Sequence, residues 1–261
     1  PGPRNETYFE HAYLASYLGY TLVQGDDLTV RDGFVWLKTL GGLEPVDIII
    51  RRVDDTFCDP LELNEESQLG IAGLLEALRR GNVVVVNPLG SSILENAGIM
   101  AFLPNICKYV LGTDLILPSV ATWWCGQPTE MEYVIDNFDN LIIKNIDRTY
   151  GVRSTMGGKV SPKYKEELIN RIKEKPHLFV GQQRLKLSTT PALKNQEIEP
   201  RNFIFRSYIV AGNEGYNVMS GGLTRSSSQK DNYLISNQMG GISKDTWVIG
   251  TEPAIVEKSN A

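Results

Sequence analysis

The sequence predicts an α/β lobe over residues 1–125, followed by an α+β lobe over residues 126–261 whose sheet is mostly antiparallel. Segments with helical and strand periodicity alternate in the first lobe, whereas the C-terminal third is mostly strand-like. The lobes also differ in charge: residues 1–125 carry 8 Lys and Arg against 16 Asp and Glu (net −8), and residues 126–261 carry 18 against 15 (net +3). This asymmetry indicates two lobes with different electrostatic roles.

The composition is that of a globular protein with a sizeable core, since 42% of the 261 residues are hydrophobic and 22% are charged. No apolar run is long enough for a membrane span, and no signal peptide pattern is present, so we expect a cytoplasmic protein without a membrane partner. Neither lobe is strongly basic, which argues against nucleic acid as a partner. The 3 Cys and 2 His are too widely spaced to predict a disulfide framework or a zinc site. The chain begins at Pro1 rather than Met, so we expect it to be part of a longer polypeptide.

In the first lobe, apolar residues at helical spacing after Asn5 predict a helix that ends at Gly19. Residues 28–39 are typical of a hairpin that turns at Asp32-Gly33. The remaining elements expected here are a strand over 47–53, a helix from Asn64 to Gly81, a buried strand over 83–86, and two short helices over 93–111 separated at Pro104.

A linker over residues 118–128 leads into the second lobe, and we expect its Trp123 and Trp124 to pack at the junction, because two large apolar rings are costly to leave in water. A helix from Thr129 and a helix opened by Ser161-Pro162 flank a strand over 141–146. The strands expected after them cover 178–185, 203–210, 216–219 and 246–250.

Lys144 is the first candidate functional residue. It follows three apolar strand residues and precedes a loop over 147–151 that contains Gly151. A lysine that leaves a buried strand can hold nucleotide phosphates as a point charge, and the following loop can cover them. The alternative is an ordinary solvated lysine at the end of a strand.

Two arginines form the second candidate group. Arg206 lies in an apolar strand, and Arg225 follows the next hairpin, so the two could meet over one pocket if their strands pair. The guanidinium fork suits a phosphate or a carboxylate. A structural salt bridge is an equally good interpretation.

A polar, glycine-containing segment over residues 236–245 is the third candidate. The amide oxygen of Asn237 could face a magnesium ion or a phosphate-bound water, and Lys244 and Asp245 add charges. A simple polar turn would have the same composition.

The fourth candidate is a charged run that follows the strand over 47–53 in the first lobe. Open α/β sheets bind ligands at the carboxyl ends of their strands, so this run is a candidate substrate site. The alternative is a surface charge cluster. The residues concerned are Arg51, Arg52, Asp54 and Asp55.

Several runs together resemble a known family, the circularly permuted ATP-grasp proteins of type 2, a group that is similar to glutathionylspermidine synthase. The resemblance covers nearly the whole chain. It rests on residues 1–12, Arg-Arg-Val-Asp-Asp at 51–55, Leu-Pro-Ser-Val-Ala-Thr-Trp-Trp-Cys-Gly at 117–126, residues 221–225 and Ser-Lys-Asp-Thr-Trp at 243–247.

The resemblance implies a Rossmann-like lobe followed by an ATP-grasp lobe, in which ATP activates a carboxylate as an acyl phosphate that an amine captures. The cofactors it implies are ATP and Mg²⁺, and the partners are small-molecule or peptide carboxylates and amines, besides helical or transglutaminase-like proteins. The implied roles are phosphate binding by Lys144 and Lys244, adenine contacts by Gln182 and Gln183, catalysis by Arg206 and Arg225, and magnesium binding by Asn237 and Asp245.

The sequence also departs from the family pattern. The loop after Lys144 has one glycine in 145–151, Ile204 stands where many relatives have an acid, and Gln183 replaces an expected Glu. Loss of these carboxylates weakens the case for magnesium. Two interpretations therefore stay open, an ATP-dependent carboxylate-amine ligase and an ATP-grasp fold that binds a ligand without full catalysis.

Overall fold

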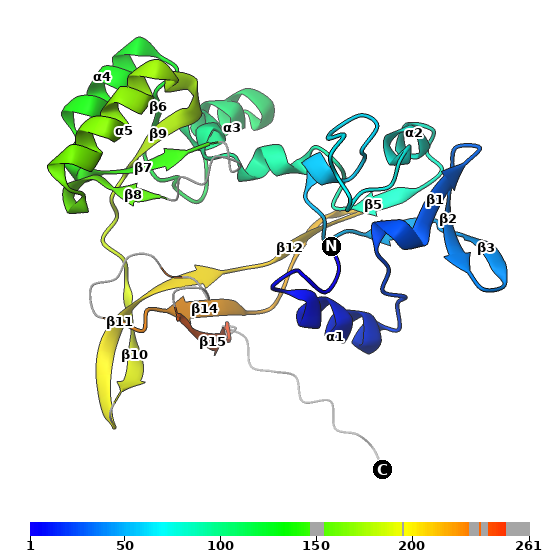
Figure 1. Cartoon of the computed structure of the whole chain (residues 1–261). Helices are drawn as coiled ribbons and strands as arrows, with labels where there is room; N and C mark the ends of the chain where they lie inside the picture. The colour runs from blue at the N-terminus through cyan, green and yellow to red at the C-terminus, as the bar shows by residue number, and fades with distance from the viewer. Residues whose placement is uncertain (147–153, 195, 230–234, 236–239, 249–261) are drawn as a thin grey trace. The chain divides into compact units, whose positions relative to one another are not determined.

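A computed structural model describes residues 1–146, 154–194, 196–229, 235 and 240–248. It divides into two compact units, Pro1–Gln183 and Arg184–Ala261 (Figure 1). The first unit contains two separate hydrophobic clusters, and the second of them begins at Cys125. The predicted domain boundary at 125/126 therefore falls inside the first unit, near a change of core, and stays a prediction.

The first part of unit one contains α1 (Tyr8–Leu18), an antiparallel sheet of β1 (Leu28–Arg31), β2 (Phe34–Thr39) and β3 (Gly42–Pro45), and a parallel pair of β4 (Ile48–Ile50) and β5 (Val84–Val86). The predicted hairpin is confirmed, because Asp32 and Gly33 both have positive φ, 55° and 81°. A two-residue turn with both residues left-handed matches the twist of the strands it joins. The described residues contain one parallel strand pair, so the Rossmann-like description stays a prediction.

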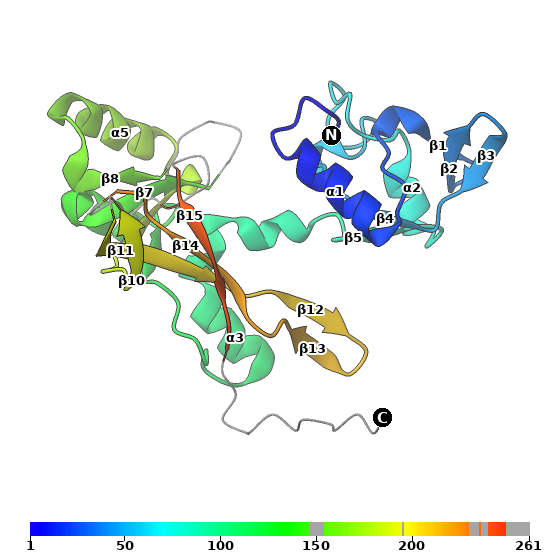
Figure 2. The ribbon, with the colours of Figure 1, turned by 90° about the horizontal axis from the view of Figure 1, so that it is seen from below.

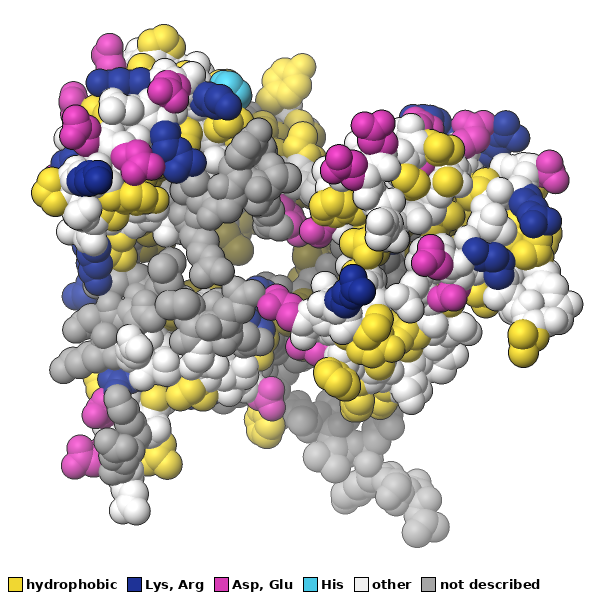
Figure 3. All heavy atoms as spheres, in the orientation of Figure 1, with side chains coloured by type: hydrophobic (Ala, Val, Ile, Leu, Met, Phe, Trp, Pro, Cys, Tyr) yellow, Lys and Arg dark blue, Asp and Glu magenta, His cyan; other side chains and the backbone are white. Residues whose placement is uncertain are grey.

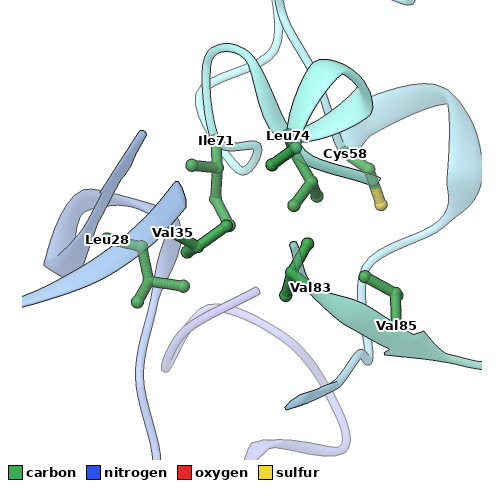
Figure 4. Packing of buried hydrophobic residues seen from close by; sticks show 8 residues of the cluster. Leu28, Val35, Cys58, Ile71, Leu74, Val83 and Val85 are labelled. Carbon is green, nitrogen blue, oxygen red and sulfur yellow. The ribbon is translucent and has the colours of Figure 1, made fainter. Parts of the chain in front are cut away.

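The first hydrophobic cluster holds this part together (Figure 4). Leu28 and Val35 come from the hairpin, Leu74 from α2 (Leu74–Arg79) and Val85 from β5, and their side chains point toward one another. The expected fully buried strand over 83–86 is only half correct, since Val84 is exposed. Side chains alternate across a strand, so one face of β5 packs on the cluster and the other does not.

The helix expected from Asn64 begins ten residues later, at the start of α2. The amide oxygen of Asn64 instead accepts a hydrogen bond from the Glu66 amide at 3.1 Å, which closes a local turn. The backbone amides at the start of α2 are satisfied by the fully buried carboxylate of Asp59, which accepts from Gly73 at 3.2 Å and from Leu75 at 2.9 Å. The Asp59 carboxylate, which is distant in the sequence, therefore caps α2 in place of a neighbouring residue.

We expect Asp59→Ala to lower the free energy of unfolding by about 2–3 kcal/mol, because buried backbone amides lose their acceptor. Asp26→Ala is the control: this carboxylate is exposed, and its loss should change stability by less than about 0.5 kcal/mol. Urea unfolding followed by circular dichroism measures both. Equal stability of the two variants would contradict the capping role of Asp59.

Helix α1 differs from its expected packing. Phe9, Tyr13 and Tyr17 share the predicted apolar face but are 84%, 67% and 75% exposed, and the buried residue of the helix is His11. Apolar side chains lie around much of this helix, so their spacing does not single out the buried side. Figure 3 shows hydrophobic side chains gathered at the surface over α1.

The connection to the second cluster runs through short 3₁₀ helices, η3 (Ser91–Glu95) and η4 (Ala97–Ala101), into α3 (Leu103–Leu111). The predicted break is confirmed, with Pro104 in the first turn of α3, where its missing amide costs nothing. A strand that the sequence missed follows: β6 (Thr122–Trp124) lies in the predicted linker. It is three residues long and pairs only at the sheet edge, too short to show a period.

The second part of unit one is an antiparallel sheet in the order β6-β9-β7-β8, where β7 is Leu141–Asn145, β8 is Thr155–Met156 and β9 is Phe179–Gln183. Helices α4 (Pro128–Asp136) and α5 (Pro162–Glu174) contribute Val134 and Leu168 to the core shared with Ile143 of β7. Figure 1 shows both helices on one side of this sheet. The other face is therefore not covered by α4 or α5.

The two tryptophans of β6 pack on opposite faces of the sheet. The Trp123 ring lies 4.6 Å from the ring of Tyr133 in α4, whereas the Trp124 ring lies 5.8 Å from that of Phe102. The Trp124 indole also donates a hydrogen bond to the carbonyl of His177 at 2.9 Å. Both rings are half-buried, so this segment of the chain is held tightly rather than acting as a loose linker.

Unit two is strand-rich, as predicted. Its antiparallel sheet has the order β10-β11-β14-β15, formed by Thr189–Lys194, Glu197–Arg206, Gly222–Ser226 and Ile242–Thr246. The hairpin of β12 (Ile209–Gly212) and β13 (Gly215–Val218) extends beyond this sheet (Figure 2). Among the described residues the last strand is β15, which ends at Thr246, and the predicted strand over 246–250 lies partly outside the described residues. No helix among the described residues has the length and apolarity needed to cross a membrane.

Candidate functional site

The face of the β6-β9-β7-β8 sheet opposite α4 and α5 carries the first group of predicted residues. In the antiparallel register Ile142 faces Gln182, and Thr122 of β6 also faces Gln182. Because side chains alternate along a strand, Lys144 points to the same face as these residues. Leu141 and Ile143 point to the opposite face and belong to the core under the helices.

Lys144 is half-buried and has no acidic partner among the described residues. Its Nζ donates a hydrogen bond to Oε1 of Gln182 at 2.7 Å. Burial lowers the pKa of the Lys144 amine, because the charged form loses hydration. An ammonium group in this position gains most from an anionic ligand, since no described carboxylate compensates its charge.

Gln182 is held in place by its other contacts. Its amide nitrogen donates to Oγ1 of Thr122 at 3.1 Å and lies 3.5 Å from the sulfur of Met100 in η4. Gly181 lets α4 approach this strand closely, because a Cβ there would lie 2.6 Å from a methyl of Val134. The amide of Gln182 is thus oriented toward Lys144 by packing on both sides.

Gln183 does not share this position. It is exposed and points to the opposite face from Gln182, although its backbone amide bonds to the carbonyl of Ala121 at 2.9 Å. Of the two glutamines predicted beside adenine, the structure therefore brings only Gln182 next to Lys144.

In unit two the predicted arginines lie on one sheet face, because their strands do pair. Arg225 faces Ile204 on β11, Leu223 faces Arg206, and Leu223 also faces Asp245 on β15. These registers put both guanidinium groups and the Asp245 carboxylate on the same side of the sheet. The Nε of Arg225 is buried and has no hydrogen-bond partner among the described residues.

Lys244 lies on the other face of this sheet, in register with Thr224. Its Nζ donates to Oγ1 of Thr190 at 3.3 Å and to the carbonyl of Pro191. The structure therefore separates Lys244 from Arg206 and Arg225 and gives it acceptors within the sheet. Its assignment to the nucleotide stays a prediction.

The two predicted magnesium ligands, Asn237 and Asp245, do not form a metal site in the described structure. Asn237 lies outside the described residues, and Asp245 is exposed on β15. The part of the chain that the structure describes contains no group of three or more His, Cys, Asp or Glu side chains able to hold a metal ion. The described donor set thus does not fit a magnesium site, whereas the Lys144 amine in unit one and the Arg225 guanidinium group in unit two each have the charge to bind an anionic group.

In the charged run after β4, Arg51 has a structural role. Arg51 donates to the carbonyl of Asn87 at 2.7 Å, to that of Val53 at 2.8 Å and to Oγ of Ser91 at 3.1 Å, and it forms an ion pair with Asp55. These contacts fasten the loops after β4 and β5 to one another. Arg52, by contrast, is exposed.

Asp55 is the anionic half of this arrangement. Its Oδ2 accepts from the amides of Gly90 at 2.9 Å and Ser92 at 3.1 Å. Burial by itself would raise the pKa of this carboxyl, but the hydrogen bonds from Ser92 and Gly90 and the charge of Arg51 outweigh it, so the pKa of Asp55 is lowered. The carboxylate is therefore held ionised.

His11 is a candidate site residue that the sequence reasoning missed. It lies in a pocket of about 290 Å³ together with Arg51, Arg52 and Asp54. The only sequence signal for it is its place in the first run shared with the family, because helix periodicity put the buried face elsewhere. Burial is the largest cause that lowers the pKa of His11 below its usual 6.5, and the positive charge of Arg52 is the next.

This lowered pKa predicts a pH dependence of stability. The unfolded chain binds a proton below pH 6.5 where folded His11 does not, so the stabilisation is complete above pH 6.5 and is lost as the pH falls toward the folded-state pKa. Urea midpoints should fall between about pH 7.5 and about pH 5.5. His11→Gln should reduce this fall, while His177→Gln, at an exposed position, should keep it. An unchanged fall in His11→Gln would assign it to other groups.

Several known proteins are similar to this chain over most of its length. The uncharacterized protein sll0335 of Synechocystis sp. is 36% identical over 249 residues, covering 95% of this chain and 52% of the relative. The uncharacterized proteins Rv2411c and Rv2567 of Mycobacterium tuberculosis are 35% and 39% identical, over 95% and 85% of this chain and 45% and 25% of their own lengths. The chain thus spans about half or less of these relatives. A family model described as circularly permuted ATP-grasp type 2 matches residues 1–227, and the chain belongs to that family.

Proposed function

We propose that this chain binds ATP and takes part in ATP-dependent ligation of a carboxylate to an amine through an acyl phosphate. Family membership supports ATP as the cofactor. The single structural observation that carries the proposal is the half-buried Lys144, which has an amide but no described carboxylate as its partner. A charge in that state is stabilised by a phosphate group.

The proposed division of labour follows from the geometry of each unit. Lys144 holds a phosphate oxygen, and Gln182 fixes the direction of the Lys144 ammonium group. In unit two, the buried Nε of Arg225 and the guanidinium group of Arg206 on the same sheet face are the proposed cations of that unit. ATP supplies the phosphoryl group that activates the carboxylate. Cations fixed before the reaction lower its barrier because they need no reorganisation.

Trapping with hydroxylamine tests the proposal directly. Hydroxylamine captures an acyl phosphate as a hydroxamate, so we expect ATP-dependent hydroxamate formation with at least one of a panel of amino acids and small peptides. Lys144→Gln should lose it, whereas Lys163→Gln, at an exposed position in α5, should keep it. Hydroxamate formation that persists undiminished in Lys144→Gln would refute the role of Lys144.

A binding module is the second candidate function, and one observation favours it. Ile204 faces Arg225 across the strand pair, at a place where a carboxylate could have held a metal ion beside the phosphates. Saturable ATP binding without hydroxamate from any tested carboxylate would support this candidate. The ligase proposal would then be wrong for this chain.

A further inference from the structure

The pocket beside α1 brings together two runs that lie far apart in the sequence. Thr7 and His11 line it from the α1 side, and the segment Arg51 to Asp55 lines it from the end of β4. Its volume is about 290 Å³, enough for a small metabolite rather than a nucleotide. All of these residues belong to the first part of unit one.

The hydrogen bonds of Thr7 fix the tautomer of His11. Asn5 Oδ1 accepts from the Thr7 amide at 2.9 Å and from the Thr7 hydroxyl at 2.6 Å. Because the hydroxyl gives its proton to Asn5, it can only accept from His11 Nε2, which lies 2.9 Å away. Neutral His11 therefore carries its proton on Nε2, and its Nδ1 presents a lone pair.

The charged side chains around the pocket are one fixed pair, Arg51 and Asp55, and a group of exposed residues. Arg51 and Asp55 neutralise each other, and both also bond to the backbone. Arg52 and Asp54 are exposed side chains of the pocket lining. One exposed cation, Arg52, and two exposed carboxylates, Asp54 and Glu95, thus line the pocket together with His11.

A zwitterion matches this set of groups. An ammonium group donates to His11 Nδ1 and to the Asp54 carboxylate, while Arg52 binds a carboxylate through its guanidinium fork. Phosphate is a poor match, because the carboxylates of Asp54 and Glu95 also line the pocket. The net charge of −8 over residues 1–125 likewise favours a ligand that carries an amine.

We propose that the pocket formed by His11, Arg52 and Asp54 binds a free α-amino acid as the amine substrate. This inference rests on the proposed function, since it names the acceptor of the acyl phosphate. His11 and Asp54 orient the ammonium group, and His11 Nδ1 accepts one of its protons. The free amine then forms the C–N bond to the acyl carbon, the C–O bond to the phosphoryl group breaks, and inorganic phosphate leaves. Arg52 selects amines that also carry a carboxylate.

Nuclear magnetic resonance of the histidine side chains tests the site, because the chain has only two histidines, His11 and His177. A long-range ¹H–¹⁵N spectrum of the whole chain should show His11 protonated on Nε2. The twenty standard amino acids are then added one at a time. At least one of them should shift the His11 signals in a saturable way and leave the His177 signals unchanged. A proton on Nδ1 of His11, or no shift with any amino acid, would overturn the proposal.

Analogues of the best-binding amino acid then separate its two charges. The decarboxylated amine and the deaminated acid should each bind about tenfold or more weakly, since each loses a charge-assisted contact. Arg52→Gln should weaken the amino acid by a similar factor but not the decarboxylated amine, and Arg31→Gln, at an exposed position, should change neither. Equal affinity for the amine and the amino acid would instead identify a polyamine-type site and overturn the role of Arg52.

His11→Gln tests the acceptor nitrogen while keeping a donor for Thr7, because the glutamine amide can replace the Nε2 proton. We expect about a tenfold loss of amino-acid affinity by calorimetry, with unchanged ATP affinity. Full amino-acid affinity in this variant would contradict the role of His11. Amino-acid binding in a wild-type chain that fails to bind ATP would leave this site intact and refute the proposed function alone.

Discussion

Replacing Lys144 by Gln is expected to weaken ATP binding by about 5- to 150-fold, the equivalent of about 1–3 kcal/mol for a charge-assisted contact. The glutamine keeps a hydrogen-bonding side chain opposite Gln182 but removes the positive charge. Because Lys144 is half-buried, its interaction with a phosphate is screened less than that of a surface lysine. Equilibrium binding of ATP by calorimetry measures the change.

Lys163→Gln is the matched control, since it removes the same charge from an exposed position of the same unit. It should leave the dissociation constant of ATP within about twofold. Circular dichroism would establish that both variants are folded. Equal ATP affinity of the two variants would place the nucleotide away from Lys144.

Arg51→Met is expected to lower the free energy of unfolding by about 3–5 kcal/mol, the largest stability effect among these predictions. The substitution removes donors to the carbonyls of Asn87 and Val53 and leaves Asp55 as a partly buried charge without its ion-pair partner. The side chains of Arg51 and Asp55 are 14% and 12% exposed, so water replaces little of what is lost. Urea unfolding of both proteins measures the difference.

Arg80→Met provides the control, because its ion pair with Glu76 is about half exposed, at 55% and 47%. Such a pair contributes about 0–1 kcal/mol. Adding Asp55→Asn to Arg51→Met should recover part of the stability, since the amide oxygen can still accept from Gly90 while the charge is gone. No recovery in the double variant would attribute the loss to packing rather than to the unpaired charge.

The sequence predicts those elements that local chemistry determines. The Asp32-Gly33 hairpin, the break at Pro104 and the helix opened by Ser161 are each set by one or two residues, and all three are present. The start of α2 depends on Asp59, which lies fourteen residues before Gly73. The prediction that Asn64 caps this helix was therefore wrong, because the cap is not local in the sequence. Strand β6 likewise owes its place to pairing with β9 rather than to its own pattern.

Site residues follow the same division. The order of the strand segments along the chain was enough to expect Arg206 and Arg225 on paired strands. The structure pairs those strands, β11 and β14. The sequence does not predict that Lys244 lies on the other face from these arginines. This depends on the exact strand register, because a shift of one residue moves a side chain to the opposite face of the sheet. His11 was missed because α1 exposes its aromatic residues and buries a polar one.

The most direct test of the central claim compares ATP with adenosine in calorimetric titrations of the wild-type chain. If Lys144 holds a phosphate, ATP should bind at least about tenfold more tightly than adenosine, and Lys144→Gln should remove most of that preference. The preference isolates the contribution of the phosphates, because both compounds carry the same base and sugar. Equal affinities for ATP and adenosine, or no binding of either, would contradict the account.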